Sequence, residues 1–287
     1  MLNPQCLCAF LAIFMPALHS QDFKDVEYAR AGKVSLLLDA HIPDGRGPFA
    51  AVILVHGGAW VAGDRANNIN IQPLLKPLSD ARIAWFSISY RLATDVARNP
   101  VGAATHLGTA ESDVRRSVAF VKEHAAEYRV NPNRIVLIGQ SAGGQLAAMA
   151  ALRPDVDGAV QGVVGFYTPS DLASLARTSR FIPDGVKDAV QGTMFENILM
   201  KGLTKFSPIN AVSEKAPPFL LIHGTDDNVV PFAQSERFCE KLKAAGAGCE
   251  LYAVKGGGHG AGAWESLKLT DYKAPMMRWL LRTLGPS

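Results

Sequence analysis

A serine placed between two glycines, where a strand-like run meets a helix-like run, constrains the fold of this chain more than any other feature. The pentapeptide 139–143 (Gly-Gln-Ser-Ala-Gly) follows the β-branched run 134–138 and opens the helical stretch 142–152. Glycines two residues before and two residues after a serine permit a cramped strand–turn–helix elbow that exposes the hydroxyl. An ordinary Gly-Ser turn needs no strand before it and no helix after it, so the flanking runs predict an elbow at Ser141.

The rest of the chain repeats this alternation of strand-like and helix-like segments. Short β-branched runs bounded by turn residues are typical of buried strands. They are found at residues 51–55, 83–89, 134–138, 160–166, 219–222 and 250–254. Because helical stretches separate several of these runs, the predicted fold class is α/β, with a mostly parallel central sheet and helices on both faces.

Four helices are expected from apolar spacing and capping residues. The first has Thr109 as its N-cap and carries an apolar stripe formed by Val114, Val118, Val121, Ala125 and Tyr128. The other three cover residues 142–152, 232–245 and 264–284. Residues 168–217 break the rhythm with proline, glycine and short polar clusters. They are expected to form a small cap-like insertion over the C-terminal edge of the sheet, where open α/β folds bind ligands.

Length and composition set the domain organisation and exclude some partners. A chain of 287 residues with 48% hydrophobic content can bury a sizeable core, so residues 21–287 are expected to form one domain. The formal net charge is +3 and the sequence has no block of Lys or Arg. Nothing in this charge pattern predicts a nucleic-acid partner.

The N-terminal segment has the features of an export signal. The first 20 residues contain no Lys, Arg, Asp or Glu, and the apolar run 6–18 has the length of a signal-peptide h-region. A membrane-spanning helix would need about 20 apolar residues. Residues 1–20 are therefore predicted to be a signal peptide, with an exported mature chain that has no membrane span. A membrane anchor and a buried N-terminal element are the alternatives.

Removal of residues 1–20 would leave two cysteines, Cys239 and Cys249. A pair in an oxidising compartment permits one disulfide. Two separately packed thiols are the other possibility. Neither cysteine has another Cys or a His at metal-ligand spacing, so no metal site is predicted.

Ser141 needs a base to act as a nucleophile, because a neutral hydroxyl attacks poorly at neutral pH. In proteins with this elbow, an acid and then a histidine follow the serine along the chain. Only His223 and His259 follow Ser141, and His223 precedes the expected acid. His259 lies in the glycine-rich segment 256–260, directly after the last expected strand, so it is the predicted base. A solvated loop histidine is the alternative.

The acid is expected in the loop after the run 219–222, where Asp226 and Asp227 are adjacent. Asp227 is preferred because it lies four residues after His223 and four before Pro231, a spacing common in hydrolases with this elbow. Asp226 is the alternative, although it could instead be a turn residue that bonds its own backbone. The predicted role of the acid is to hold the imidazole tautomer and to stabilise the imidazolium.

The segment 56–60 (His-Gly-Gly-Ala-Trp) follows the run 51–55, where an oxyanion loop belongs in this class of fold. The backbone N–H groups of Gly57 and Gly58 are expected to face a substrate carbonyl, and the N–H of Ala142 to supply the remaining donor. Trp60 and Tyr167 are candidates to line the substrate pocket. Core packing is an equal alternative for Trp60.

These motifs together resemble the α/β-hydrolase carboxylesterases, and most closely the bacterial group that includes feruloyl and acetyl-xylan esterases. The resemblance rests on the segments 56–60, 63–65 (Gly-Asp-Arg), 89–92 (Ser-Tyr-Arg-Leu), 139–144 (Gly-Gln-Ser-Ala-Gly-Gly) and 223–227 (His-Gly-Thr-Asp-Asp). It implies cofactor-independent hydrolysis of short-chain, acetyl or hydroxycinnamoyl esters, either small molecules or carbohydrate-linked, through an acyl-enzyme. It also implies the catalytic residues Ser141, Asp227 and His259.

Two residues depart from the patterns of related esterases. Ala59 replaces the third glycine of the usual H-G-G-G run, and Gln140 replaces the Asp frequent before the serine in the hormone-sensitive-lipase group. The H-G-G-x-W pattern also occurs in kynurenine formamidases, so an amidase is the alternative activity. A catalytically inactive binding protein is the alternative from another class, since hydrolase folds are reused for adhesion. The presence of all three triad residues in the expected order disfavours it.

Overall fold

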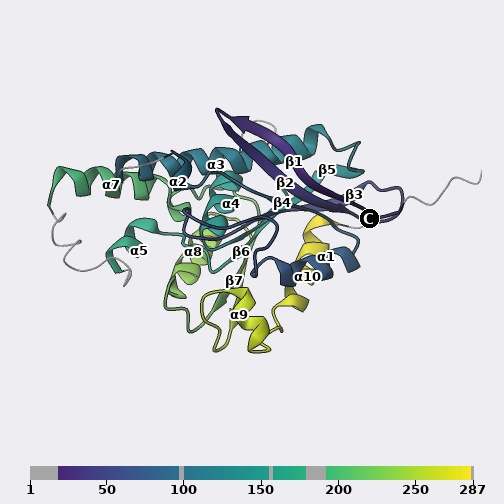
Figure 1. Cartoon of the computed structure of the whole chain (residues 1–287). Helices are drawn as coiled ribbons and strands as arrows, with labels where there is room; N and C mark the ends of the chain where they lie inside the picture. The colour runs from purple at the N-terminus through teal and green to yellow at the C-terminus, as the bar shows by residue number, and fades with distance from the viewer. Residues whose placement is uncertain (1–18, 97–99, 155–157, 179–191, 286–287) are drawn as a thin grey trace, which may run out of the picture.

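An eight-stranded sheet forms the centre of the molecule (Figure 1). The computed structural model describes residues 19–96, 100–154, 158–178 and 192–285. The strands lie in the order β1-β2-β4-β3-β5-β6-β7-β8. Their bounds are β1 (Gln21–Ala31), β2 (Val34–Ile42), β3 (Phe49–Val55), β4 (Ala84–Ile88), β5 (Val130–Gln140), β6 (Gly162–Phe166), β7 (Phe219–Gly224) and β8 (Cys249–Val254). Strands β3 to β8 pair in parallel, whereas β1 and β2 are antiparallel to their neighbours, which confirms the predicted mostly parallel sheet.

Helices cover both faces of this sheet (Figure 1). They are α1 (Gln72–Asp80), α2 (Ala93–Val96), α3 (Pro100–Glu123), α4 (Ala142–Leu152), α5 (Leu172–Thr178), α7 (Met194–Lys205), α8 (Ala233–Ala244), α9 (Ala261–Ser266) and α10 (Lys273–Leu284). Helices α3, α4 and α8 contribute to the core cluster on one face, and α1, α9 and α10 to the cluster on the other. The helices expected over 142–152 and 232–245 are confirmed, since α4 and α8 occupy those segments.

Strand β3 shows how the two core layers share one strand. Ala51, Ile53 and Val55 belong to the cluster beneath α3, α4 and α8, while Val52 and Leu54 belong to the opposite cluster. All five are fully buried. A strand covered on both faces needs an unbroken apolar run instead of an alternating one. This burial anchors the loop that follows β3 at the C-terminal edge of the sheet, beside the end of β5.

Several elements differ from their sequence-based expectations. Strands β1 and β2 and helix α1 were not predicted; β1 is exposed along most of its length, so it lacks the apolar run that marks a buried strand. The helix expected to begin after Thr109 begins at Pro100, a residue suited to the first helical position. The single helix expected over 264–284 is divided into α9 and α10. Pro275 accounts for the division, because proline is tolerated in the first turn of α10 but not inside a longer helix.

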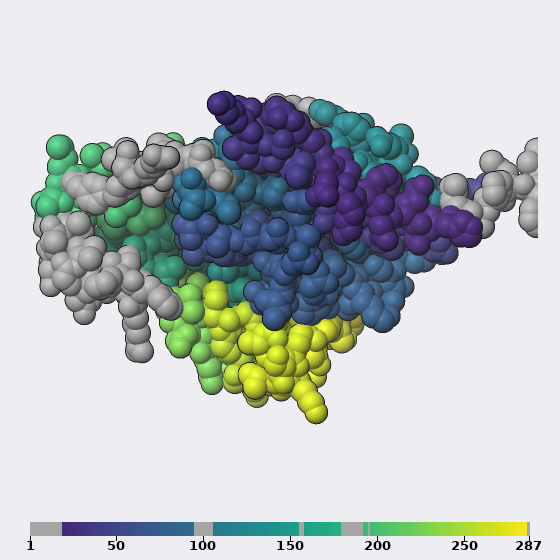
Figure 2. All heavy atoms as spheres, in the orientation of Figure 1, coloured from purple at the N-terminus to yellow at the C-terminus, as the bar shows by residue number. Residues whose placement is uncertain are grey.

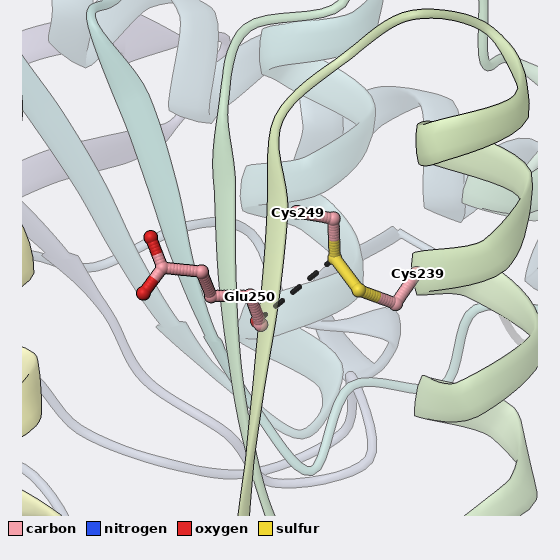
Figure 3. The surroundings of a disulfide bond; sticks show 3 residues. All are labelled: Cys239, Cys249 and Glu250. Carbon is pink, nitrogen blue, oxygen red and sulfur yellow. Dashed lines mark hydrogen bonds between the residues drawn. A yellow bond between two sulfur atoms is a disulfide. The ribbon is translucent and has the colours of Figure 1, made fainter.

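A disulfide joins Cys239 on α8 to Cys249 at the start of β8 (Figure 3). Their Cα atoms are 5.5 Å apart. The structure therefore has the disulfide, and not two separately packed thiols. It ties α8 to the edge strand whose other end leads into the glycine-rich segment 256–260.

The N-terminal hairpin and the C-terminal helices lie at opposite margins of the molecule. Figure 2 shows β1 and β2 in purple along one margin, with α9 and α10 in yellow on the other side. Among the described helices, none combines the length and the apolar character needed to cross a membrane. Residues 1–18, the greater part of the predicted signal peptide, lie outside the described residues.

Candidate active site

Ser141 occupies a sharp turn between the end of β5 and the start of α4. Its φ of 53° lies in the left-handed region, which costs a residue with a side chain about 1–3 kcal/mol. The flanking glycines make the turn possible. A Cβ on Gly139 would lie 2.3 Å from the carbonyl oxygen of Gly143, and one on Gly143 would lie 2.2 Å from that of Val55. The elbow predicted at Ser141 is confirmed. Ser141 is partly exposed.

His259 reaches Ser141 from the loop between β8 and α9. Its Nε2 lies 3.0 Å from Ser141 Oγ, and its Nδ1 lies 2.7 Å from Asp227 Oδ2. The imidazole is only 19% exposed. The structure therefore places the predicted base between the predicted nucleophile and one of the two candidate acids.

Neighbouring residues hold the glycine-rich loop that carries His259. The N–H of Gly256 donates to Thr225 Oγ1 at 2.9 Å, and the indole N–H of Trp264 donates to the carbonyl oxygen of Gly258 at 2.8 Å. A segment rich in glycine loses much conformational freedom when it is ordered. These contacts therefore fix the position from which His259 projects.

The structure distinguishes the two adjacent carboxylates. Asp226 is exposed and accepts a hydrogen bond from the hydroxyl of Thr225 at 2.9 Å. Asp227 is buried and lies against His259. Since neighbouring residues of this loop point in different directions, Asp227 is the carboxylate that meets the imidazole, as the spacing predicted.

Four N–H groups converge on the Asp227 carboxylate. Oδ1 accepts from the backbone N–H groups of Val229 and Val230 at 2.9 Å each. Oδ2 accepts from His259 at 2.7 Å and lies 3.2 Å from Nε2 of His223. Burial alone would raise the pKa of Asp227, but the hydrogen bonds from His223 and His259, together with the backbone donors, lower it well below its ordinary value. Asp227 is therefore ionised at neutral pH.

His223 is a site residue that the sequence analysis passed over. It is fully buried, and its Nε2 faces both Asp227 Oδ2 and the carbonyl oxygen of Val230, the latter at 2.9 Å. Because both are acceptors, Nε2 carries the proton, and Nδ1 accepts from the hydroxyl of Ser235 at 2.7 Å. The signal in the sequence was its position four residues before Asp227, which had served only to select the acid.

The loop after β3 presents backbone N–H groups beside Ser141. Across the described residues, the N–H groups of Gly57, Gly58 and Ala142 make no hydrogen bond to the protein. A Cβ on Gly57 would lie 3.3 Å from the Cβ of Ser141, so this loop packs directly on the elbow. Gly58 has a φ of 122° and a Cβ there would lie 2.0 Å from the carbonyl oxygen of Ala62, so only glycine fits. Within the described structure, the three predicted oxyanion donors therefore have no protein acceptor, and they belong to segments that meet at Ser141.

His56 begins this loop and, within the described structure, makes no side-chain hydrogen bond to Ser141. It is buried, its ring stacks on Tyr90 with centroids 4.4 Å apart, and Nδ1 lies 2.7 Å from the carbonyl oxygen of Gly57. Burial lowers the pKa of His56, which keeps the ring neutral, and Nδ1–H donates to that carbonyl. Its contribution is to shape the loop, in agreement with the expected buried hydrogen-bonding role.

The two candidate pocket residues have different positions. Trp60 is partly exposed, and its indole N–H donates to Gln145 Oε1 at 2.9 Å. Tyr167 has no exposed surface. Its ring packs edge-on against His259 at 4.6 Å, and its hydroxyl accepts from the N–H of Ala261 at 3.1 Å. The prediction that Tyr167 lines the substrate pocket is therefore corrected: the buried Tyr167 ring packs against His259.

The described part of the insertion, α5, α7 and the 3₁₀ turn Pro208–Asn210, lies at the end of α3 and beside α4 (Figure 1). Its Phe206 packs with Leu107, Met149 and Leu172 in a small apolar cluster, against which Trp60 also packs. Residues 179–191 of the insertion lie outside the described residues. The insertion thus contacts the site through the Trp60 side of the oxyanion loop.

The arrangement of these groups is one that can support acyl transfer. A hydroxyl, an imidazole and an ionised carboxylate lie in series, and beside the hydroxyl are N–H groups that have no acceptor among the described residues. This arrangement can activate an oxygen nucleophile and stabilise an oxyanion. Among the described residues, no group of three or more His, Cys, Asp or Glu side chains could hold a metal ion.

Comparison with known proteins gives a family. The BD-FAE family model matches residues 38–242. The probable carboxylic ester hydrolase LipM of Mycobacterium tuberculosis is 29% identical over 255 residues, which cover 85% of this chain and 56% of LipM. The chain spans about half the length of the curated relatives it matches.

Solved structures give the fold. A truncated carbohydrate esterase from gut microbiota is 25% identical, with a TM-score of 0.69 over 93% of this chain and 97% of that one. Esterase 2 of Thermogutta terrifontis, in a form phosphonylated by sarin, is 26% identical, with a TM-score of 0.68 over 91% of this chain and 96% of that one. The α/β-hydrolase fold implied by the sequence motifs is thereby confirmed.

Proposed function

The chain belongs to the BD-FAE family, and from this membership and the geometry of the site we propose that it is a serine carboxylic-ester hydrolase that acts through an acyl-enzyme. The observation that carries the proposal is the pair of contacts made by His259, 3.0 Å to Ser141 Oγ and 2.7 Å to Asp227 Oδ2. Both distances lie within hydrogen-bond reach, as a nucleophile, its base and the orienting acid require.

In the acylation step, Ser141 Oγ attacks the ester carbonyl carbon while His259 Nε2 accepts the hydroxyl proton. The carbonyl oxygen becomes an oxyanion, to which the N–H groups of Gly57, Gly58 and Ala142 donate. When the carbonyl re-forms, the bond to the alcohol oxygen breaks and the alcohol takes the proton from the imidazolium. Ser141 is left as an ester of the acyl group.

In the deacylation step, a water molecule replaces the alcohol. His259 accepts a proton from water as the water oxygen attacks the acyl carbonyl carbon. The imidazolium then returns the proton to Ser141 Oγ as the carboxylic acid leaves. Asp227 stays ionised throughout and stabilises the imidazolium. The lowered pKa of Asp227 suits this role, because the carboxylate does not take the proton itself.

The covalent step can be tested directly. The related esterase 2 is described as phosphonylated by sarin, and an alkyl fluorophosphonate is the corresponding probe for this chain. We expect one equivalent of label on Ser141, located by peptide mass spectrometry, and none in Ser141→Ala. That variant should keep its thermal midpoint and lose nearly all p-nitrophenyl acetate turnover. Full turnover in folded Ser141→Ala would refute the proposal.

For the substrate, we propose short-chain, acetyl and hydroxycinnamoyl esters, including carbohydrate-linked ones. Support comes from the motif resemblance to feruloyl and acetyl-xylan esterases and from the structural likeness to a carbohydrate esterase. A panel of p-nitrophenyl acetate, butyrate and octanoate, methyl ferulate and acetylated xylan tests this. The highest kcat/KM should fall on acetyl or feruloyl esters, and a maximum at octanoate would contradict the proposal.

An amidase of the kynurenine-formamidase type is the second candidate, favoured only by the segment 56–60. An aryl formamide assayed beside p-nitrophenyl acetate separates the two activities. Ester turnover should exceed amide turnover, and the reverse order would favour the amidase.

We also propose that the chain acts outside the cytoplasm. The disulfide between Cys239 and Cys249 supports this, because such bonds persist in oxidising compartments. Expression of the full chain followed by fractionation should recover a product that begins at Gln21 in the exported fraction. An uncleaved product confined to the cytoplasm would contradict the proposal.

A further inference from the structure

A buried glutamine links three segments around the nucleophile. Gln145 lies one turn after Ser141 on α4 and has no exposed surface. Its Oε1 accepts from the indole N–H of Trp60 at 2.9 Å, and its Nε2 donates to the carbonyl oxygen of Phe206 at 2.8 Å. The indole can only donate and the carbonyl can only accept, so these partners fix the orientation of the amide.

A polar side chain at this position needs an explanation. The other buried residues of α4 are all apolar or glycine, namely Ala142, Gly143, Gly144, Leu146, Ala147, Ala148, Met149, Ala150 and Ala151. A buried amide is costly unless both of its ends are hydrogen-bonded. Gln145 meets this condition only with Trp60 and Phe206 in their present places, so the amide specifies both positions.

Trp60 belongs to a strained part of the oxyanion loop. Ala59 and Trp60 have φ values of 52° and 63°, so two successive residues with side chains lie in the left-handed region. Such a conformation persists only where its surroundings determine it. The N–H of Ala93 holds the Trp60 carbonyl oxygen at 2.8 Å, and Gln145 holds the Trp60 side chain. Gly57 and Gly58, two of the proposed oxyanion donors, immediately precede these residues.

We infer that Gln145 is a positioning residue for the oxyanion hole: by holding the Trp60 indole it fixes the strained loop that orients the N–H groups of Gly57 and Gly58. This inference rests on the proposed function. Gln145 itself is too deeply buried to touch substrate. Because its other end is bound to Phe206, it also links the position of the insertion to the position of the oxyanion donors.

The first test is Gln145→Met, which has similar length and removes both hydrogen bonds. We expect kcat for p-nitrophenyl acetate to fall about 10- to 100-fold, since misplacing oxyanion donors costs less than deleting one. KM should change little, because the substrate contacts are intact. Gln145→Glu keeps the acceptor for Trp60 and should retain more of kcat than Gln145→Met.

Gln234→Met is the matched control for loss of a buried glutamine. Gln234 is also buried, and its Oε1 accepts from the backbone N–H groups of Ser170 and Asp171 at 3.0 and 2.7 Å, away from the oxyanion loop. Gln234→Met removes four side-chain hydrogen bonds against two in Gln145→Met, so it should lower the thermal midpoint at least as much while leaving kcat close to the wild-type value. An equal fall of kcat in both variants would mean that Gln145 acts only through stability, and would overturn the inference.

Two further readouts separate positioning from general destabilisation. A trifluoromethyl ketone adds to Ser141 and places an oxyanion where the transition state has one, so its inhibition constant should rise in proportion to the loss of kcat/KM. Trp60→Phe removes the indole donor. If Gln145 acts through Trp60, the double variant Gln145→Met/Trp60→Phe should lose no more kcat than the more impaired of the two single variants. Fully additive losses would overturn the inference.

The outcomes also separate this inference from the proposed function. If Ser141→Ala is inactive while Gln145→Met has wild-type kcat and inhibitor affinity, only the role of Gln145 is refuted. If folded Ser141→Ala is active, the proposed function itself fails. Should Gln145→Met fail to fold, Gln145→Glu and Trp60→Phe provide the test, and wild-type kcat in both would overturn the inference.

Discussion

Replacement of Asp227 by asparagine tests the centre of the site, because N–H groups face both oxygens of the carboxylate and an amide has only one oxygen to accept from them. Oδ1 receives two backbone N–H groups, and Oδ2 lies within 2.7 Å of His259 Nδ1 and 3.2 Å of His223 Nε2. A carboxylate accepts at both oxygens, whereas asparagine has one acceptor and one donor group. In Asp227→Asn, the amide NH₂ must therefore face either the two backbone N–H groups or the two imidazoles.

The second orientation keeps the loop intact and disables the base. An NH₂ group that faces Nδ1 of His259 makes that atom an acceptor, so the ring proton moves to Nε2. Nε2 then has no free lone pair and cannot accept the hydroxyl proton of Ser141. This wrong tautomer lowers kcat by about 10⁴. The N–H of His223 loses one of its two acceptors, and the unfolding free energy should fall by about 1–3 kcal/mol.

Asp226→Asn is the adjacent control, because Asp226 is exposed and its carboxylate bonds only to Thr225 in the described structure. An exposed substitution of this kind changes stability by about 0.5 kcal/mol or less and should leave kcat unchanged. Steady-state kinetics with p-nitrophenyl acetate and urea unfolding measure both quantities. Equal losses in the two variants, or an Asp227→Asn enzyme with more than about a tenth of wild-type kcat, would refute the assignment of the acid.

Three further predictions concern the surroundings of the triad. Because the pKa of Asp227 is lowered in the folded state, its carboxylate stabilises the fold at pH values above the ordinary Asp pKa of about 4, and this contribution is lost as the pH falls below that value. In urea unfolding, the difference in unfolding free energy between wild type and Asp227→Asn should therefore narrow from pH 7 to pH 3. A difference that stays constant would argue against this contribution. Tyr167→Phe leaves the buried N–H of Ala261 without its acceptor and should lower the unfolding free energy by about 1–3 kcal/mol, whereas no loss would show that Tyr167 contributes only its ring. Cys239→Ser combined with Cys249→Ser opens a loop with a sequence separation of 10 and should cost at most about 3 kcal/mol with kcat retained, measured against wild type with and without reductant.

Local chemistry explains which parts of the site could be predicted. The Ser141 elbow needs glycines at fixed offsets, and helix α4 covers the expected residues 142–152. His259 was the predicted base because the expected order of a triad along the chain left no other histidine. Asp227 was preferred on spacing alone, and the choice over Asp226 became firm only when the direction of each side chain was known.

The residues that were missed act through contacts between segments distant in sequence. His223 and Gln145 are both polar residues buried in otherwise apolar elements, β7 and α4. Their partners Ser235, Trp60 and Phe206 lie 12, 85 and 61 residues away. No periodicity or turn signal reports such pairs. The same limit applies to Tyr167, which was expected to line the pocket and instead packs against His259.

Backbone strain follows the same division between local and distant causes. Of the eight non-glycine residues with positive φ in the described structure, four lie at the site, namely Ala59, Trp60, Ser141 and Tyr167. Each of the last three has a main-chain anchor on a neighbouring segment: Ala93 N–H donates to Trp60, while the N–H groups of Ser141 and Tyr167 donate to carbonyl oxygens of β6 and β7. Local propensity opposes these conformations and tertiary hydrogen bonds impose them. The segment 56–60 and the Ser141 elbow therefore take their shape from the assembled sheet, so substitutions that remove a contact holding this shape, such as Gln145→Met, should lower kcat more than an equally destabilising substitution elsewhere.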